Sequence, residues 1–300
     1  MSVHITFDIF SGVPNPAVVL DDTAAATFLN GLGFDSTKAT QLEQSAESKL
    51  GYRGLIVEQR GMPKNGLDSR FRIANKQVNS AGKSYALTTQ SPESTLLGNS
   101  ALVHAAGISS ELAALIQNEA VTASAIGKKN APVPSESGTP PTLLKCACAP
   151  VYEPSWWNDA ATGGARQFHN NCYNYACDYR TDTYAQPGRA GGMHLSSILC
   201  AAVRPAVVSD ALAGYAPTPS TNLKCPDKGN LIAIAIWPNW DFHCYRLGSD
   251  GYWTHKPGSN PVTNLDNSGR VIVDPRTADR GRYTDFCSFM VVMHGHVKLQ

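Results

Sequence analysis

Hydrophobic and polar residues alternate with a period of two at the start of the chain, from Val3 to Phe10. This period is typical of a half-buried β-strand. Comparable strand patterns follow at residues 54–59, 71–78 and 84–89. Helices are predicted from an N-cap at Asp21 or Asp22 to about Leu32, over 92–106 and over 109–125. The pattern predicts a small α+β domain covering residues 1–126, without any group of residues that suggests chemistry.

The composition changes between residues 127 and 145, where proline, serine, glycine and lysine are frequent and apolar residues are few. Four prolines, at 132, 134, 140 and 141, exclude a helix in this stretch. We therefore expect a linker over 127–145 and a second domain over 146–300.

In the second domain, helical patterns come before strand patterns. Helices are expected over 172–183, capped by Asn170 or Asn171, and over 194–204, ending before Pro205. Strands are expected over 230–237, 242–247, 252–255 and 286–293. This order predicts an α+β domain with N-terminal helices and an antiparallel sheet.

Charge and hydrophobicity exclude several classes of partner. The formal net charge is +1 over 300 residues, and the charge is nearly balanced in each half, so no nucleic-acid partner is expected. No stretch approaches the roughly 20 apolar residues that cross a bilayer, so no membrane span is expected. The N-terminus also lacks the pattern of a secretory signal, which favours a cytoplasmic protein or export by a route independent of such a signal.

All eight cysteines lie between residues 146 and 287. They could form disulfides in an oxidising compartment or remain buried thiols, and the sequence leaves both readings open. Cys146 and Cys148, with His294 and His296, are a weaker candidate for a metal site, because their spacing does not require one. We expect neither a metal nor an organic cofactor.

The candidate chemistry lies at three residues of the second domain. Cys172 begins a predicted helix, whose N-terminus would lower the pKa of a thiol and offer backbone N–H groups to an oxyanion. His243 and His255 lie on the two arms of a predicted hairpin, so their imidazoles should meet. One could then act as a base while the other orients it. Cys172 could instead be an ordinary buried or disulfide-bonded cysteine.

These residues resemble those of the NlpC/P60 cysteine peptidases of the papain-like superfamily. The resemblance rests on Asn171-Cys172, on Gly229-Asn230-Leu231 before a strand, and on the His243–His255 spacing of twelve. It covers about residues 165–256. It departs from the family in having Asn171, rather than aspartate, before the cysteine, and Tyr173 after it.

The resemblance implies a papain-like fold and a cysteine hydrolase that cleaves peptide amide bonds, with bacterial peptidoglycan as the favoured substrate. In that scheme Cys172 would be the nucleophile, His243 the base and His255 the orienting residue. Tyr173, Trp237, Trp240 and Arg246 would bind the substrate. The resemblance also suggests that the enzyme is an effector or toxin, with a protein partner for its delivery or for immunity against it.

Two alternatives remain open. An enzyme with the same three residues could transfer an acyl or amide group instead of hydrolysing an amide. The chain could also be a non-catalytic, disulfide-stapled protein whose tryptophan-rich surface binds a glycan or another surface.

Overall fold

The fold is given by a computed structural model, which describes residues 2–35, 37–41, 49–61, 66–89, 91–125, 142–159, 164–215 and 223–300. The chain divides into two compact units. The first consists of residues 1–9, 15–46 and 52–130, and the second of residues 10–14, 47–51 and 131–300. The second unit thus includes a short segment from near the N-terminus. Of the expected linker 127–145, residues 127–141 lie outside the described residues.

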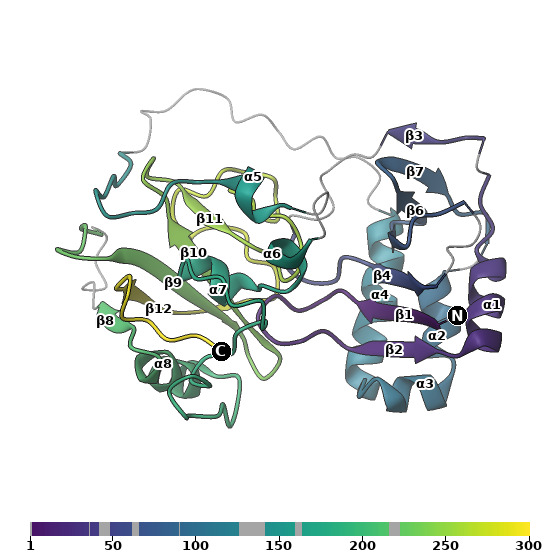
Figure 1. The fold of residues 1–300 in the computed structure, drawn as a ribbon, viewed down its shortest axis with the longest axis horizontal. Coiled ribbons are helices and arrows are strands. Elements are labelled where there is room, and N and C mark those ends of the chain that lie inside the picture. Colours follow the sequence, from purple (N-terminus) through teal and green to yellow (C-terminus); the bar gives the residue numbers. More distant parts are fainter. Residues whose placement is uncertain are drawn as a thin grey trace. The chain divides into compact units, whose positions relative to one another are not determined.

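The first unit is built on an antiparallel sheet of strand order β2-β1-β4-β5-β6-β7-β3 (Figure 1). Its strands are β1 (Ser2–Phe7), β2 (Ala17–Leu20), β3 (Thr40–Gln41), β4 (Leu55–Arg60), β5 (Arg70–Ala74), β6 (Gln77–Ser80) and β7 (Lys83–Ala86). The alternation expected in β1 is present, because Val3, Ile5 and Phe7 are buried and the residues between them are half-buried. One expected strand, 71–78, is instead a hairpin that turns at Asn75 and Lys76, where φ is 52° and 57°.

Among the described residues of this unit, four helices accompany the sheet: α1 (Asp22–Gly31), α2 (Pro92–Leu97), α3 (Ser100–Ala105) and α4 (Ser110–Ala125). The Asp21 side chain accepts a hydrogen bond from the Ala24 N–H and caps α1, as expected from the sequence. The expected helix 92–106 is broken in two, because the Asn99 side chain accepts hydrogen bonds from the first turn of α3 and starts a new helix.

The second unit has an antiparallel sheet of strand order β11-β10-β9-β12-β8. Its strands are β8 (Ala213–Tyr215), β9 (Asn230–Trp237), β10 (Asp241–Leu247), β11 (Trp253–His255) and β12 (Asp285–Val292). Every residue of β9 is buried, which fits its continuous apolar sequence and its place inside the sheet between β10 and β12. This central strand fixes the position of β10, which carries the candidate chemistry.

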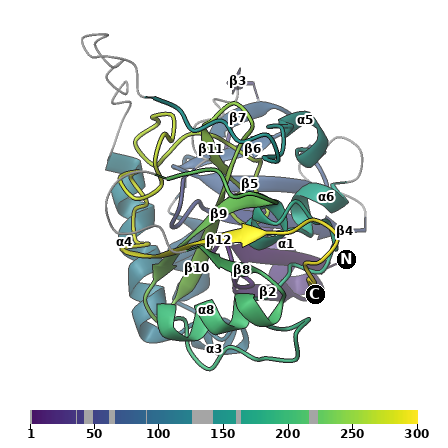
Figure 2. The same cartoon turned by 90° about the vertical axis from the view of Figure 1, so that its left-hand side faces the viewer.

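Four short helices belong to the second unit: α5 (Pro154–Trp157), α6 (Ala165–Phe168), α7 (Cys172–Ala176) and α8 (Cys200–Ser209). Helix α7 packs against β10 and β11 (Figure 1), and α8 lies beside β8 and β12 (Figure 2). α7 is shorter than the expected 172–183, and the chain leaves helical geometry at Asp178, where φ is 50°. α8 begins later than expected and continues through Pro205, which the sequence had suggested as its end.

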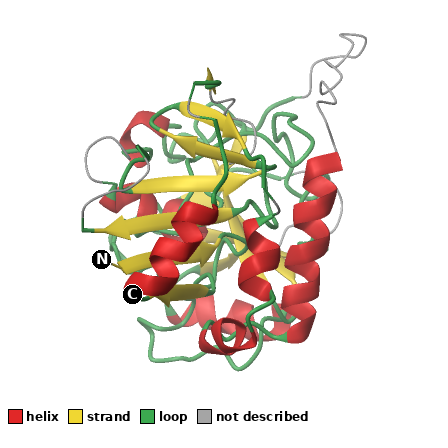
Figure 3. Cartoon of the chain, turned by 90° about the vertical axis from the view of Figure 1, so that its right-hand side faces the viewer, coloured by secondary structure: helices red, strands yellow, loops and turns green. Residues whose placement is uncertain are grey.

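Helices and strands both contribute to the described structure (Figure 3). With two antiparallel sheets and few helices, the architecture is compatible with the expected α+β class. The narrower expectation of a papain-like fold is not shown. Within the part of the chain that the structure describes, no helix has the length and apolar character needed to cross a membrane.

Candidate functional site

Cys172 is the first residue of α7, and the helix is capped as the sequence predicted. The Asn171 side chain accepts hydrogen bonds from the N–H groups of Tyr173 and Asn174, and the Asn174 side chain accepts one from the Asn171 N–H, which forms a capping box. The N–H of Cys172 itself donates to the Ser11 carbonyl at 3.4 Å. The donors that an oxyanion would need are therefore engaged within the protein.

The two histidines of the hairpin lie together. Tyr245 of β10 pairs with His255 of β11, and His243 is two residues earlier on the same face of β10. His243 Nε2 lies 2.8 Å from His255 Nδ1. Both side chains are almost fully buried, with exposed fractions of 0% and 1%.

Hydrogen bonds hold both rings in place and, for uncharged rings, define the tautomers. His255 Nε2 lies 2.9 Å from the Leu265 carbonyl, which can only accept, so this nitrogen carries the proton. His255 Nδ1 then accepts from His243 Nε2–H. His243 Nδ1 in turn accepts from the Ser11 hydroxyl at 2.8 Å. The pair is thus held in one orientation by groups at both ends.

The thiol of Cys172 faces the other side of β10. Its sulfur lies 3.8 Å from the Phe242 carbonyl oxygen and forms a hydrogen bond with the thiol of Cys244. Phe242 and Cys244 share one face of the strand, and His243 points to the opposite face. Burial, reinforced by the Cys244 thiol, raises the pKa of Cys172 well above its ordinary value. The sequence had predicted a lowered pKa, and the structure shows the reverse direction.

A buried carboxylate, which the sequence reasoning missed, holds the segment that carries Ser11. The carboxylate of Asp241 accepts from the N–H groups of Ser11 at 2.6 Å, Gly12 at 3.1 Å and Val13 at 2.8 Å. The hydroxyl of Tyr283 donates to Asp241 and lies 3.0 Å from the Ser11 hydroxyl. Burial raises the pKa of Asp241, although these hydrogen bonds oppose the rise.

Only glycine fits at position 12, because a Cβ there would lie 2.4 Å from the Phe242 carbonyl oxygen. The glycine and proline of Ser11-Gly12-Val13-Pro14 are typical of a turn. Its partner at position 241 lies about 230 residues away, and no local signal links the two.

Two of the expected substrate-binding residues are interior groups. The hydroxyl of Tyr173 donates to Asp210 at 2.9 Å, and its ring is fully buried. The guanidinium of Arg246 lies 4.0 Å from the centre of the Tyr175 ring and donates to Asp178 at 2.7 Å. Both side chains attach α7 to its surroundings, and neither is exposed to a ligand.

The two expected tryptophans lie at the turn between β9 and β10. The rings of Trp237 and Trp240 are 5.8 Å apart and tilted by 31°. Trp237 is largely buried against Phe10 and Tyr283, whereas Trp240 is half-buried. The guanidinium of the exposed Arg282 lies 5.6 Å from the centre of the Trp237 ring. This part of the candidate site reaches the surface.

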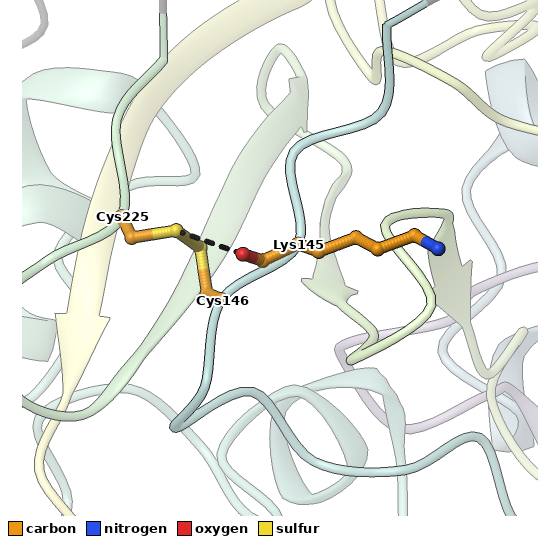
Figure 4. The surroundings of a disulfide bond; sticks show 3 residues. All are labelled: Lys145, Cys146 and Cys225. Atoms are coloured by element: carbon orange, nitrogen blue, oxygen red, sulfur yellow. Dashed lines mark hydrogen bonds between the residues drawn. A yellow bond between two sulfur atoms is a disulfide. The ribbon is translucent and has the colours of Figure 1, made fainter.

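Four cysteines of the second unit form two disulfides, Cys146–Cys225 and Cys200–Cys287. Figure 4 shows the first, in which the Cys225 sulfur lies 3.4 Å from the Lys145 carbonyl oxygen. Of the remaining thiols, Cys148 is exposed, and Cys172, Cys177 and Cys244 are buried. Among the described residues, no three side chains of histidine, cysteine, aspartate or glutamate come together as a metal site.

Comparison with known proteins gives one decisive relative. Over 147 residues the chain is 43% identical to insoluble matrix shell protein 1 of Ruditapes philippinarum, and the match covers 48% of this chain and 91% of the relative. The chain belongs to the family of insoluble matrix shell protein 1. No family model and no solved structure matches the chain.

This relationship corrects the functional prediction made from the sequence. The assignment to the NlpC/P60 peptidases was wrong, because the family that is shown is named for a shell matrix protein and not for a peptidase. The same finding contradicts three further predictions: a hydrolase that acts on peptidoglycan, an enzyme of the cysteine peptidase class, and an effector or toxin. The peptide substrate and the delivery or immunity partner have no support. The resemblance depended on a few short patterns, which unrelated chains can share.

Proposed function

We propose that this chain is a non-catalytic matrix protein whose disulfide-bonded second unit binds an insoluble polysaccharide of an extracellular matrix. The observation that carries the proposal is the 43% identity to insoluble matrix shell protein 1, matched over 91% of that relative. Because the match covers nearly all of the relative and about half of this chain, it supports a shared role for a domain-sized region rather than for a local motif.

The interior of the second unit supports a structural role for the residues that resembled a catalytic site. Cys172 and His243 are fully buried, and His255 is 1% exposed. A nucleophile must be reached by its substrate, and a raised thiol pKa leaves little thiolate at neutral pH. Hydrogen-bonded histidines in a core satisfy the requirement that buried polar groups have partners.

The two disulfides support a location outside a reducing compartment. Such bonds form and persist in secreted and extracellular proteins. The two bonded pairs are separated by 79 and 87 positions in the sequence, so the disulfides connect distant parts of the second unit. A protein held in this way is suited to persist in a matrix.

The turn between β9 and β10 is the surface that we assign to polysaccharide binding. Trp240 is half-buried and supported by Trp237 beneath it, and Pro238 and Asn239 lie between them in the turn. An indole ring offers a large, rigid apolar face at low entropic cost, and its N–H can donate to a hydroxyl group. Arg282, close to Trp237, adds donors for sugar hydroxyl groups.

The proposal is tested by co-sedimentation of the full chain with insoluble chitin and cellulose. We expect binding to at least one of them and a loss of roughly tenfold in affinity for Trp240→Ala, since an aromatic platform contributes up to about 1.5 kcal/mol. Arg282→Ala should cost less, because a single hydrogen bond contributes about 1 kcal/mol. Trp156→Ala is the matched control, because Trp156 is an exposed tryptophan on α5 of the same unit. Equal sedimentation of Trp240→Ala and the unmodified chain would contradict the assignment of the surface, and no sedimentation with either polymer would contradict the function.

A further inference from the structure

The buried thiols of Cys172 and Cys244 form a pair that joins α7 to β10. Cys172 is the first residue of the helix, and Cys244 is in the middle of the strand. The thiols are hydrogen-bonded to each other, and both residues are fully buried in one hydrophobic cluster. The function proposed above leaves this pair without a role.

Aromatic contacts hold the helix in register with the strand on both sides of the pair. The ring of Tyr173 packs edge-to-face on Phe242, with centroids 6.4 Å apart. Two residues further along α7, the centre of the Tyr175 ring lies 4.0 Å from the guanidinium carbon of Arg246. Phe242 and Arg246 are the residues two positions before and after Cys244, on the same face of β10. The two sulfurs are therefore held opposite each other by packing on either side.

A disulfide needs only a small further approach from this arrangement. The sulfurs of a disulfide are about 2.05 Å apart, closer than those of two hydrogen-bonded thiols, so oxidation draws the two sulfurs together without separating α7 from β10. The other four cysteines that lie near one another in this unit are already oxidised, as Cys146–Cys225 and Cys200–Cys287. The unit therefore matures where disulfides form.

We propose that Cys172 and Cys244 form a third disulfide, made during folding by exchange with a small-molecule or protein disulfide. The thiolate of one cysteine attacks the external disulfide, forms a mixed disulfide and releases one thiol. The thiolate of the other then attacks the protein sulfur of the mixed disulfide and releases the second thiol. The pair loses two protons and two electrons, and the external disulfide is reduced to two thiols.

The exchange takes place before α7 is packed against β10, because no oxidant reaches two fully buried sulfurs afterwards. The resulting bond closes a loop between positions 172 and 244. It stands on the geometry of the second unit alone and does not depend on polysaccharide binding.

The test is a count of free thiols in the full chain folded with oxidised and reduced glutathione. The protein is denatured in N-ethylmaleimide without reductant, and its intact mass is measured. The proposal expects two labels, at Cys148 and Cys177, whereas reduced Cys172 and Cys244 would give four. Cys244→Ser distinguishes the two cases by the direction in which the number of labels changes. The number rises from two to three if the bond exists, and it falls from four to three if it does not.

Peptide mapping of the unmodified chain identifies the bond directly. Trypsin releases residues 167–180, with Cys172 and Cys177, and residues 229–246, with Cys244. We expect these two peptides to be joined before reduction, and to remain joined in Cys177→Ser, which is the matched control. Recovery of both peptides as separate species with alkylated cysteines would overturn the proposal. Loss of the link in Cys177→Ser would do the same.

Discussion

Replacing Cys200 and Cys287 by serine removes the disulfide that ties the start of α8 to β12. The bond closes a loop of 87 residues, and the chain-entropy relation gives a loss of about 4.6 kcal/mol in the free energy of unfolding. The same relation for Cys146–Cys225, with a separation of 79, gives about 4.5 kcal/mol. We therefore expect the two double variants to be destabilised almost equally.

The assay is guanidinium unfolding followed by tryptophan fluorescence. All five tryptophans lie between residues 156 and 253, so the signal reports the second unit even if the first unfolds separately. With an m-value of about 4 kcal/mol/M, each double variant should shift the midpoint by roughly 1 M. A loss below about 1 kcal/mol for either variant would refute the entropic reasoning. A difference above about 2 kcal/mol between the variants would show that native-state contacts, rather than loop size, decide the effect.

Three further predictions concern buried charges and thiols. Burial raises the pKa of Asp241, so the folded state retains a proton that the unfolded state releases. The free energy of unfolding should therefore fall as the pH rises above about 4. Asp241→Asn should reduce this pH dependence, measured as the denaturation midpoint at a series of pH values. In the first unit, the guanidinium groups of Arg53 and Arg72 lie 2.6 and 2.7 Å from the Asp8 carboxylate and lower its pKa despite its burial. The contribution of Asp8 to the free energy of unfolding should therefore be lost as the pH falls below about 4. Asp8→Asn should cost about 3–5 kcal/mol in melts followed by far-UV circular dichroism, and a cost below about 1 kcal/mol would contradict the pairing. Iodoacetamide at neutral pH should label the exposed Cys148 in the native protein and spare Cys172, and rapid labelling of Cys172 by peptide mass spectrometry would show that its thiol is not protected.

Local patterns predicted the elements whose burial is uniform or strictly alternating. The apolar run 230–237 is β9, residue for residue, because a strand inside a sheet is buried on both faces. Boundaries failed where a single residue changes the backbone. Asn99 caps a new helix within 92–106, and the positive φ of Asn75 turns the expected strand 71–78 back on itself.

Helix α8 failed for a different reason. Pro205 predicts the end of the helix, yet it lies inside α8. A proline there leaves the carbonyl of the residue four positions earlier, Ala201, without its helical donor. Burial of Val203, Ala206 and Val207 on one side of the helix supplies packing that compensates for the lost bond.

At the candidate site, the sequence predicted which residues would be neighbours within one hairpin and could not predict which face a helix would cover. The spacing of His243 and His255 places His243 Nε2 2.8 Å from His255 Nδ1, as two arms of a hairpin allow. The same alternation places Cys244 on the face of β10 opposite His243. Packing of α7 on the Cys244 face is a tertiary choice, made by contacts such as Tyr173 with Phe242, and it brings the thiol of Cys172 to that face.

The hydrogen-bonded network around Ser11, Asp241 and His243 shows how residues that resemble a catalytic site can stabilise a fold. Ser11 and Asp241 are 230 positions apart, and the segment Ser11–Val13 can enter the second unit only if its N–H groups find acceptors there. Asp241 supplies them, and Tyr283 and His243 satisfy the remaining polar atoms around Ser11. Removing any one group from this hydrogen-bonded network leaves a buried donor or acceptor unpaired, which costs about 1–3 kcal/mol of stability. Residue types that are used in catalysis therefore also hold an N-terminal segment against a distant sheet. Ser11, Asp241 and His243 are each 0% exposed, and the proposed non-catalytic role assigns this hydrogen-bonded network to stabilising the fold.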